Sequence, residues 1–302
     1  MRKIIQSLAA AAAATTALSI IPLALAGAAS ASTTPAPVLK YNTNWAGYVD
    51  VPASGQVVGE AYASFVVPKI NCAKSIIGPH EASAAFRKAH GNDWSAVTYW
   101  VGIDGQGGQS GALEQIGVTA VCHSKTSAAV YMPFWQINPR VHHNMTLSFG
   151  DPVKAGDTIQ VLVRDNALGA NPSGVKPGHS YELRIVDLNQ FGESWDHSET
   201  TPAKAPGASA DYITEAVSKG PNVAHNAVGL ADTAPVHWDH ALIATYKSGG
   251  AYPLDTLKGF WAAQRWFVVK APHSESPVYV TTSPLTQDAD GYSVFTNTFV
   301  AK

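Results

Sequence analysis

The feature that most constrains the fold is a series of short runs rich in Val, Thr, Tyr and Trp, which recur from residue 44 onward between Gly, Pro, Asn and Asp. Within 157–164, Ile159, Val161 and Val163 alternate with residues that lie on the opposite face of an extended chain. This period of two is typical of β-strands. The candidate strands are 45–50, 57–66, 96–103, 112–121, 127–137, 144–149, 157–164, 180–187, 210–217, 236–245, 264–269, 277–282 and 292–300.

Helical patterns are scarce, and the best candidate is one short surface helix over 81–89. Many short strands without alternating helices predict an all-β fold, an antiparallel β-sandwich. We expect a single sandwich domain over 44–302, since strand patterns continue on both sides of the Pro- and Ala-rich segment 202–209, which we interpret as a surface loop.

The first residues predict export. Two basic residues precede an apolar run over 8–26, and Ala29-Ser30-Ala31 supplies the small-x-small pattern of a signal peptidase site. We therefore expect a signal peptide over 1–31, a short lead-in over 32–43, a secreted, extracellular protein and no membrane association after cleavage. An uncleaved membrane anchor is the alternative.

Charge and cysteine content narrow the class further. Removal of the leader leaves 18 basic against 22 acidic residues, a mildly acidic balance that argues against a nucleic-acid partner. Cys72 and Cys122 form an even pair in an exported chain, which predicts one disulfide. Two buried free thiols are the alternative.

Common catalytic motifs are missing. The chain has no HExxH, and His237 and His240 would point to opposite sides of a regular strand, so we expect no metal and no organic cofactor. Ser110 lies in a Gly-rich turn that lacks the GxSxG spacing of a hydrolase nucleophile. These patterns do not support serine or metal catalysis.

Several motifs occur in one characteristic order, and together they resemble the glutamic peptidases (eqolisins), in particular bacterial-type secreted members. The resemblance covers about residues 42 to 300 and implies a concanavalin-like sandwich of two large antiparallel sheets with a substrate groove. The motifs are "NWAGYV" (44–49), "SFVVP" (64–68), "WVGIDG" (100–105), "LEQIGV" (113–118), "AGDTIQVLV" (155–163), "ADYITEAV" (210–217) and the closing "SPLTQDADGYSVFTNTF".

The resemblance implies that Gln115 and Glu215 are the catalytic pair. Strand periodicity puts Gln115 on one face with Leu113 and Gly117, and Glu215 on one face with Asp211. An ionised Glu can activate a water, and a Gln amide can donate to the oxyanion that develops during attack on a peptide carbonyl. The alternative is that Gln115 only satisfies neighbouring polar groups and Glu215 is an exposed strand-edge carboxylate.

Supporting roles also follow from the resemblance. Trp45 and Trp100 match aromatic residues near the groove, with plain core packing as the alternative, and Asp104 matches a recurrent acid that is otherwise a turn former. Gln136 stands where the family commonly has Glu, and it is the feature that leaves the pH profile open. The strand of Glu215 also departs from the family, with Asp211 in place of Glu and with Tyr212 and Thr214 in place of Trp and Val.

These observations predict a secreted, monomeric endopeptidase that hydrolyses peptide bonds of unfolded proteins at acidic pH. Its partners are protein or peptide substrates. Two alternatives remain open at this point: a lectin-like carbohydrate-binding sandwich that uses the abundant Trp and Tyr residues, and a catalytically weakened pseudo-peptidase.

Overall fold

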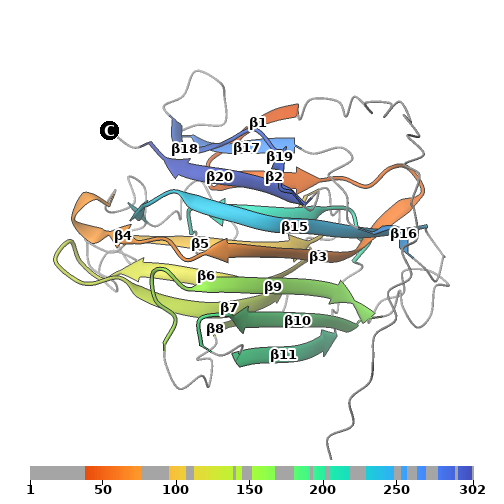
Figure 1. Cartoon of the computed structure of the whole chain (residues 1–302), viewed down its shortest axis with the longest axis horizontal. Helices are drawn as coiled ribbons and strands as arrows, with labels where there is room; N and C mark the ends of the chain where they lie inside the picture. Colours follow the sequence, from red (N-terminus) through yellow and green to blue (C-terminus); the bar gives the residue numbers. More distant parts are fainter. Residues whose placement is uncertain are drawn as a thin grey trace, which may run out of the picture. The chain divides into compact units, whose positions relative to one another are not determined.

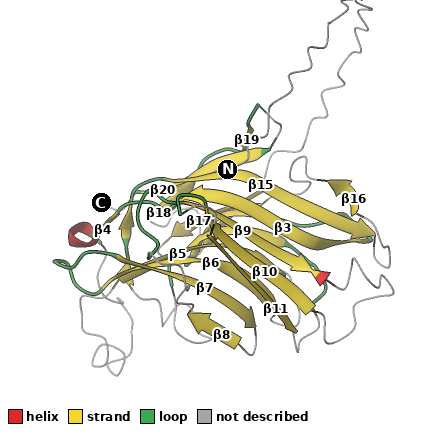
Figure 2. Ribbon diagram, turned by 60° about the horizontal axis from the view of Figure 1, so that its bottom comes forward, coloured by secondary structure: helices red, strands yellow, loops and turns green. Residues whose placement is uncertain are grey.

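Strands account for most of the residues described in the computed structural model (Figures 1 and 2). All described residues belong to the unit Pro35–Lys302. The expected leader, the first half of the lead-in (32–37) and the candidate helix 81–89 lie outside the described residues. The structure describes 38–75, 95–106, 112–138, 141–144, 152–166, 180–190, 193–200, 205–217, 229–247, 253–256, 264–269, 278–289 and 292–300.

The first sheet carries the predicted catalytic residues. Its neighbours are antiparallel, except that β1 runs parallel to β17 and the short β13 (Gly229–Leu230) runs parallel to the start of β5. In spatial order the strands are β1 (Val38–Asn42), β17 (Gln264–Val269), β2 (Trp45–Asp50), β12 (Ala210–Glu215), β5 (Ser95–Ile103), β6 (Leu113–Cys122), β7 (Val130–Asn138) and β8 (Val141–Asn144).

The second sheet is antiparallel throughout its main strands, and pairing of β17 with β18 joins it to the first sheet along one edge. Short strands β16 (Pro253–Thr256) and β19 (Thr286–Gln287) extend it beside β15 and β20. In spatial order the main strands are β18 (Val278–Thr282), β20 (Ser293–Phe299), β15 (Val236–Lys247), β3 (Gln56–Val66), β9 (Thr158–Asp165), β10 (Ser180–Asp187) and β11 (Glu193–Thr200).

The main hydrophobic core lies between the two sheets, where β5 and β6 contact β9. Polar groups also cross this layer: the Tyr212 hydroxyl donates to the carbonyl oxygen of Leu242, and Asn297 Nδ2 donates to Thr214 Oγ1 at 2.8 Å. Residues of β12 at alternate positions therefore face the second sheet. The predicted all-β sandwich of two large sheets is confirmed.

The predicted disulfide is also confirmed. Cys72 begins the short 3₁₀ helix η1 (Cys72–Lys74), which follows β4 (Ile70–Asn71), and it is bonded to Cys122 at the end of β6. Their Cα atoms are 5.5 Å apart across a sequence separation of 50 residues. The bond ties the β4 region, where β4 pairs with β14 (Asp232–Thr233), to the first sheet.

Most candidate strands agree with the structure within two or three residues. Two of the longer strands were missed, β1 and β11, and so were the short strands β4, β13, β14, β16 and β19. β11 ("ESWDHSET") has too many polar residues to be recognised as a half-buried strand. The candidate over 144–149 overlaps only the last residue of β8, and 145–149 lie outside the described residues. No helix among the described residues has the length and apolar character of a membrane span.

Candidate active site

The candidate site lies on the outer face of the first sheet. Side chains of alternate positions on five strands form a second hydrophobic cluster that is separate from the core between the sheets. Because successive strand residues point to opposite faces, this cluster marks the outward face. It comprises Val49, Trp100, Leu113, Phe134 and Ile213, with Trp45 and Val51 packed against it.

Gln115 lies on this face near the start of β6 and is only 5% exposed. Its Nε2 donates to Gln136 Oε1 at 2.9 Å, and Gln136 Nε2 donates in turn to Asn138 Oδ1 at 2.5 Å. The side-chain amide oxygen of Gln115, Oε1, is buried without a hydrogen-bond partner among the described residues. A buried amide oxygen left unpaired is costly, so this atom is suited to meeting a ligand or a water.

Glu215 ends β12 and is partly exposed on the same face. Its Oε2 accepts a hydrogen bond from Trp100 Nε1 at 2.7 Å, and its Oε1 accepts one from Asn44 Nδ2 at 3.0 Å. Desolvation raises the pKa of Glu215 to about 7, although the hydrogen bonds from Trp100, Asn44 and Trp45 oppose the shift. The group therefore changes charge close to neutral pH.

The two matched tryptophans support this carboxyl rather than forming an exposed platform. Trp100 is fully buried, and its ring packs edge-to-face against that of Trp45, with centroids 5.2 Å apart. Among the described residues, the exposed large hydrophobic side chains are all aliphatic.

Gly117 lies opposite Trp100 in the β5–β6 pairing. A glycine on this face can leave room for the backbone of a substrate. A Cβ at this position would instead lie 2.0 Å from the Tyr99 carbonyl oxygen and 2.7 Å from Trp100 Cα. The glycine is thus required for the close approach of β5 and β6.

Asp104 acts as a turn-forming residue in the structure. It follows β5 with a positive φ of 72° and is fully buried. Its Oδ2 accepts from the Gly207 backbone N–H at 3.1 Å, and its Oδ1 accepts from that of Ala208 at 2.5 Å. These bonds hold the segment that leads into β12.

Register decides which groups of this face meet. Gln115 pairs with Gly102 of β5, and Gly102 pairs on its other side with Asp211 of β12. Glu215 instead lies in the row of Thr98, four residues further along the strand. With strand spacings of about 4.8 Å and a rise of about 3.3 Å per residue, the Cα atoms of Gln115 and Glu215 are roughly 16 Å apart. The two predicted residues therefore share a face but are not level in the strand register.

Asp211 is the functional candidate that sequence reasoning passed over. It is fully buried and level with Gln115, and Gly102 separates the two without a side chain. Its Oδ2 accepts from the Gly105 backbone N–H at 2.9 Å and from Ser209 Oγ at 3.2 Å, while Oδ1 has no partner among the described residues. Burial raises the pKa of Asp211 to about 8. Its position four residues before Glu215 was the available signal, since both residues lie on the same face.

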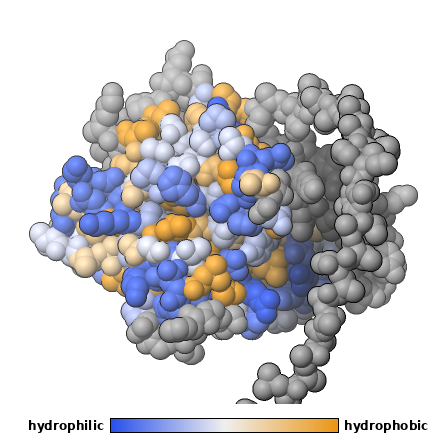
Figure 3. Space-filling view, viewed as in Figure 1, coloured by the Kyte–Doolittle hydropathy of each residue, from blue (hydrophilic) through white to orange (hydrophobic). Residues whose placement is uncertain are grey.

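A separate hollow of about 310 Å³ lies on the other sheet, the one nearer the viewer in Figure 1, where hydrophilic and hydrophobic side chains are mixed (Figure 3). Ion pairs of Arg164 with Glu60 and Glu182 cross it. It contains none of the residues predicted for catalysis. The lining residues are Glu60, Tyr62, Gln160, Val161, Leu162, Arg164, Arg184, Val186 and Leu242.

Comparison with known proteins identifies the family. Residues 43–257 match the Peptidase A4 family. The chain is also similar to the crystal structure of aspergilloglutamic peptidase from Aspergillus niger, at 21% identity and a TM-score of 0.45, over 68% of this chain and 99% of that chain. No curated protein matches the chain. The chain belongs to the Peptidase A4 family, the glutamic peptidases, which hydrolyse peptide bonds.

Proposed function

We propose that this chain is a secreted endopeptidase that cleaves unfolded proteins on the outer face of its first sheet. The proposal rests on one observation in a chain of this family. The outer face of the first sheet has the buried amide of Gln115, with an unpartnered oxygen among the described residues, and the carboxyls of Asp211 and Glu215, both with raised pKa values. A carboxylate takes a proton from water, and the water oxygen attacks the peptide carbonyl carbon. The proton then passes to the leaving amine as the C–N bond breaks.

We assign to Gln115 the role of stabilising the oxyanion that forms on the substrate carbonyl. A primary amide has two N–H donors, and the bond to Gln136 uses only one of them. The second is available to the carbonyl oxygen of a substrate as it becomes negative. Removing one such donor typically costs about 10²–10³ in rate.

We assign the role of activating carboxyl to Asp211, because Asp211 and Gln115 are both paired with Gly102, one on each side of β5. Glu215, the residue that the resemblance implies, is the competing assignment. Its partial exposure and its bonds to Trp100 and Asn44 support contact with substrate further along the same face.

The raised pKa values define the expected working range. At pH 4 a carboxyl with a pKa of about 8, as for Asp211, is ionised in about one molecule in ten thousand, and one with a pKa of about 7, as for Glu215, in about one in a thousand. A base of either kind therefore loses most of its activity in strong acid. We therefore propose mildly acidic conditions, about pH 5 to 7, for peptide-bond cleavage.

The test measures release of acid-soluble peptides from denatured casein between pH 3 and pH 8. We compare the wild type with Asp211→Asn, Glu215→Gln and Gln115→Ala, with Glu182→Gln on the second sheet as the control. Loss of cleavage in Asp211→Asn and Gln115→Ala, with an active control, supports the pairing. Loss in Glu215→Gln with an active Asp211→Asn assigns the base to Glu215. An inactive wild type at every pH would overturn the peptidase proposal and favour the pseudo-peptidase.

A further inference from the structure

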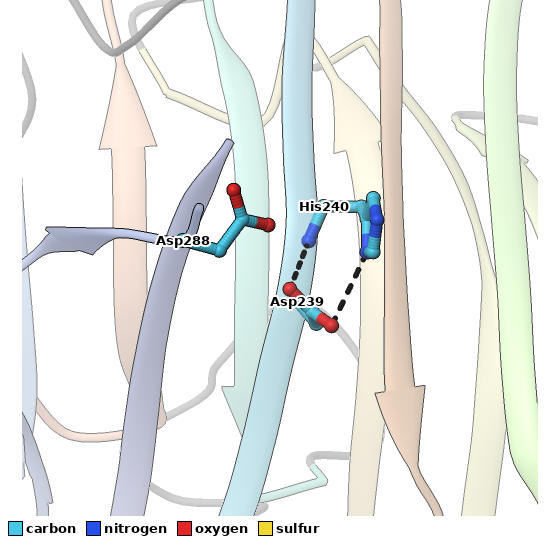
Figure 4. A group of neighbouring side chains, drawn as sticks. All are labelled: Asp239, His240 and Asp288. Carbon is cyan, nitrogen blue, oxygen red and sulfur yellow. Dashed lines mark hydrogen bonds and ion pairs between the residues drawn. The ribbon is translucent and has the colours of Figure 1, made fainter. Parts of the chain in front are cut away.

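A second group of chemically capable side chains lies on the other sheet, away from the peptidase face. Asp239 and His240 of β15 lie beside Asp288, which follows β19, and their candidate ligand atoms are all within 4.8 Å of one another (Figure 4). All three side chains are partly exposed. The group combines two carboxylates with one imidazole, a donor set that binds first-row transition metals.

A β-bulge in β15 brings the first two of these residues together. Trp238 pairs with Phe295 of β20 and Ala241 with Ser293, so β15 contains one extra residue here. The pairing with β3 shifts at the same place, between Asp239 and Leu242. His240 takes the extra position with a φ of 50°. In a regular strand Asp239 and His240 would point to opposite faces, and the bulge removes this alternation.

The spacing of the donor atoms is close to that of a metal site. His240 Nδ1 lies 3.2 Å from Asp239 Oδ2, and two ligands of a tetrahedral Zn²⁺ with bonds of about 2.1 Å lie roughly 3.4 Å apart. The His240 and Asp239 side chains are 41% and 50% exposed, so small rotations can close the remaining gap. Water can complete the coordination from the solvent side.

Asp288 is held in place by its own turn. Its Oδ1 accepts from the Tyr292 backbone N–H at 2.8 Å, and its backbone N–H donates to the Tyr292 carbonyl oxygen at 3.0 Å. The His240 ring lies 4.8 Å from the Tyr292 ring. Figure 4 shows the carboxyl of Asp288 directed toward β15. The third ligand therefore comes from a different segment, so a bound ion would link the turn before β20 to the bulge.

We propose that Asp239, His240 and Asp288 bind one divalent transition-metal ion, with Zn²⁺ as the expected species, in a site that stabilises this end of the second sheet. The proposal is independent of peptide hydrolysis, because the ligands lie on β15 and beside β20. It changes the expectation for the segment 237–240, where a regular strand predicted no metal.

The experiment is titration calorimetry of the purified, tag-free, EDTA-treated protein with ZnCl₂, repeated with CaCl₂. Absorption spectra with Co²⁺ report imidazole and carboxylate coordination. We expect one Zn²⁺ per chain in the wild type, loss of binding in His240→Ala, and affinity weakened about tenfold or more in Asp288→Asn. The Asn retains an oxygen for the Tyr292 N–H, so the turn should remain folded.

His237→Ala is the matched control. His237 lies on the same strand and contacts Thr296 Oγ1 at 3.0 Å, outside the group. Unchanged Zn²⁺ affinity in this control, together with its loss in His240→Ala, supports the site. Binding that survives in His240→Ala, no binding by the wild type at millimolar Zn²⁺, or a preference for Ca²⁺ would each overturn the proposal.

Discussion

Replacing Asp211 with Asn should change how the stability of the protein depends on pH. The carboxyl is fully buried, and burial raises its pKa from 3.8 to about 8. Asn keeps an oxygen for the donors at Gly105 and Ser209 and puts an NH₂ where the protonated acid would carry its O–H. The variant therefore resembles the protonated state at every pH.

The sign follows from linkage. Because the folded-state pKa is above the unfolded one, the folded protein holds a proton that the unfolded chain releases between about pH 4 and pH 8. This contribution to stability is fully present below about pH 4 and is lost as the pH rises through about 8. A rise of about four pH units corresponds to about 6 kcal/mol at most, comparable to the whole stability of many domains. The raised pKa of Glu215 also makes the free energy of unfolding decrease as the pH rises, and Asp211→Asn retains this second contribution.

Urea unfolding followed by tryptophan fluorescence at pH values from 4 to 8 measures this effect. We expect the free energy of unfolding of the wild type to fall by several kcal/mol across the range. Asp211→Asn should show a clearly smaller fall and should exceed the wild type at pH 8. The control Asp196→Asn, at an exposed ion pair with Arg184, should follow the wild-type slope within about 1 kcal/mol. Equal slopes for Asp211→Asn and the wild type would refute the reasoning.

Two further predictions concern a hydrogen bond and the disulfide. Trp100→Phe keeps an aromatic ring but removes the N–H that donates to Glu215. The pKa of Glu215 should therefore rise by about one to two units. A carboxyl NMR titration whose midpoint is the same as in the wild type would contradict this prediction. Replacing Cys72 and Cys122 with Ser removes the constraint on a 50-residue separation and should lower the free energy of unfolding by about 4 kcal/mol relative to the disulfide-bonded wild type, as measured by urea unfolding. A loss below about 1 kcal/mol would show that the unfolded chain gains little freedom.

Much of the fold could be predicted from local pattern. Alternating runs such as Ile159, Val161 and Val163 identify strands, because one face of each must be buried. The scarcity of helical patterns then leaves a sandwich as the solution. The polar strand β11 escaped this reasoning because its alternation carries few apolar residues, as Trp195 is followed by His197 and Glu199.

The sequence predicts which residue types form the candidate site and on which face of its strand each lies. It does not predict which residues of neighbouring strands lie beside them. Strand periodicity assigns Gln115 and Glu215 to one side of their strands whatever the neighbours are. Pairing is set by packing and by distant hydrogen bonds, so only the folded sheet puts Gln115 in the row of Gly102 and Asp211.

The bulge at His240 could not be predicted from the sequence either. One extra residue in β15 changes which side chains lie on the same face of the sheet. The sequence alone determined most of the longer strands, their faces and the cysteine pair, because these depend on a short-range period of two and on chain chemistry. Tertiary structure decided register and bulges, because they depend on contacts between strands, some of them far apart in the sequence, such as β5 with β12 and β3 with β15.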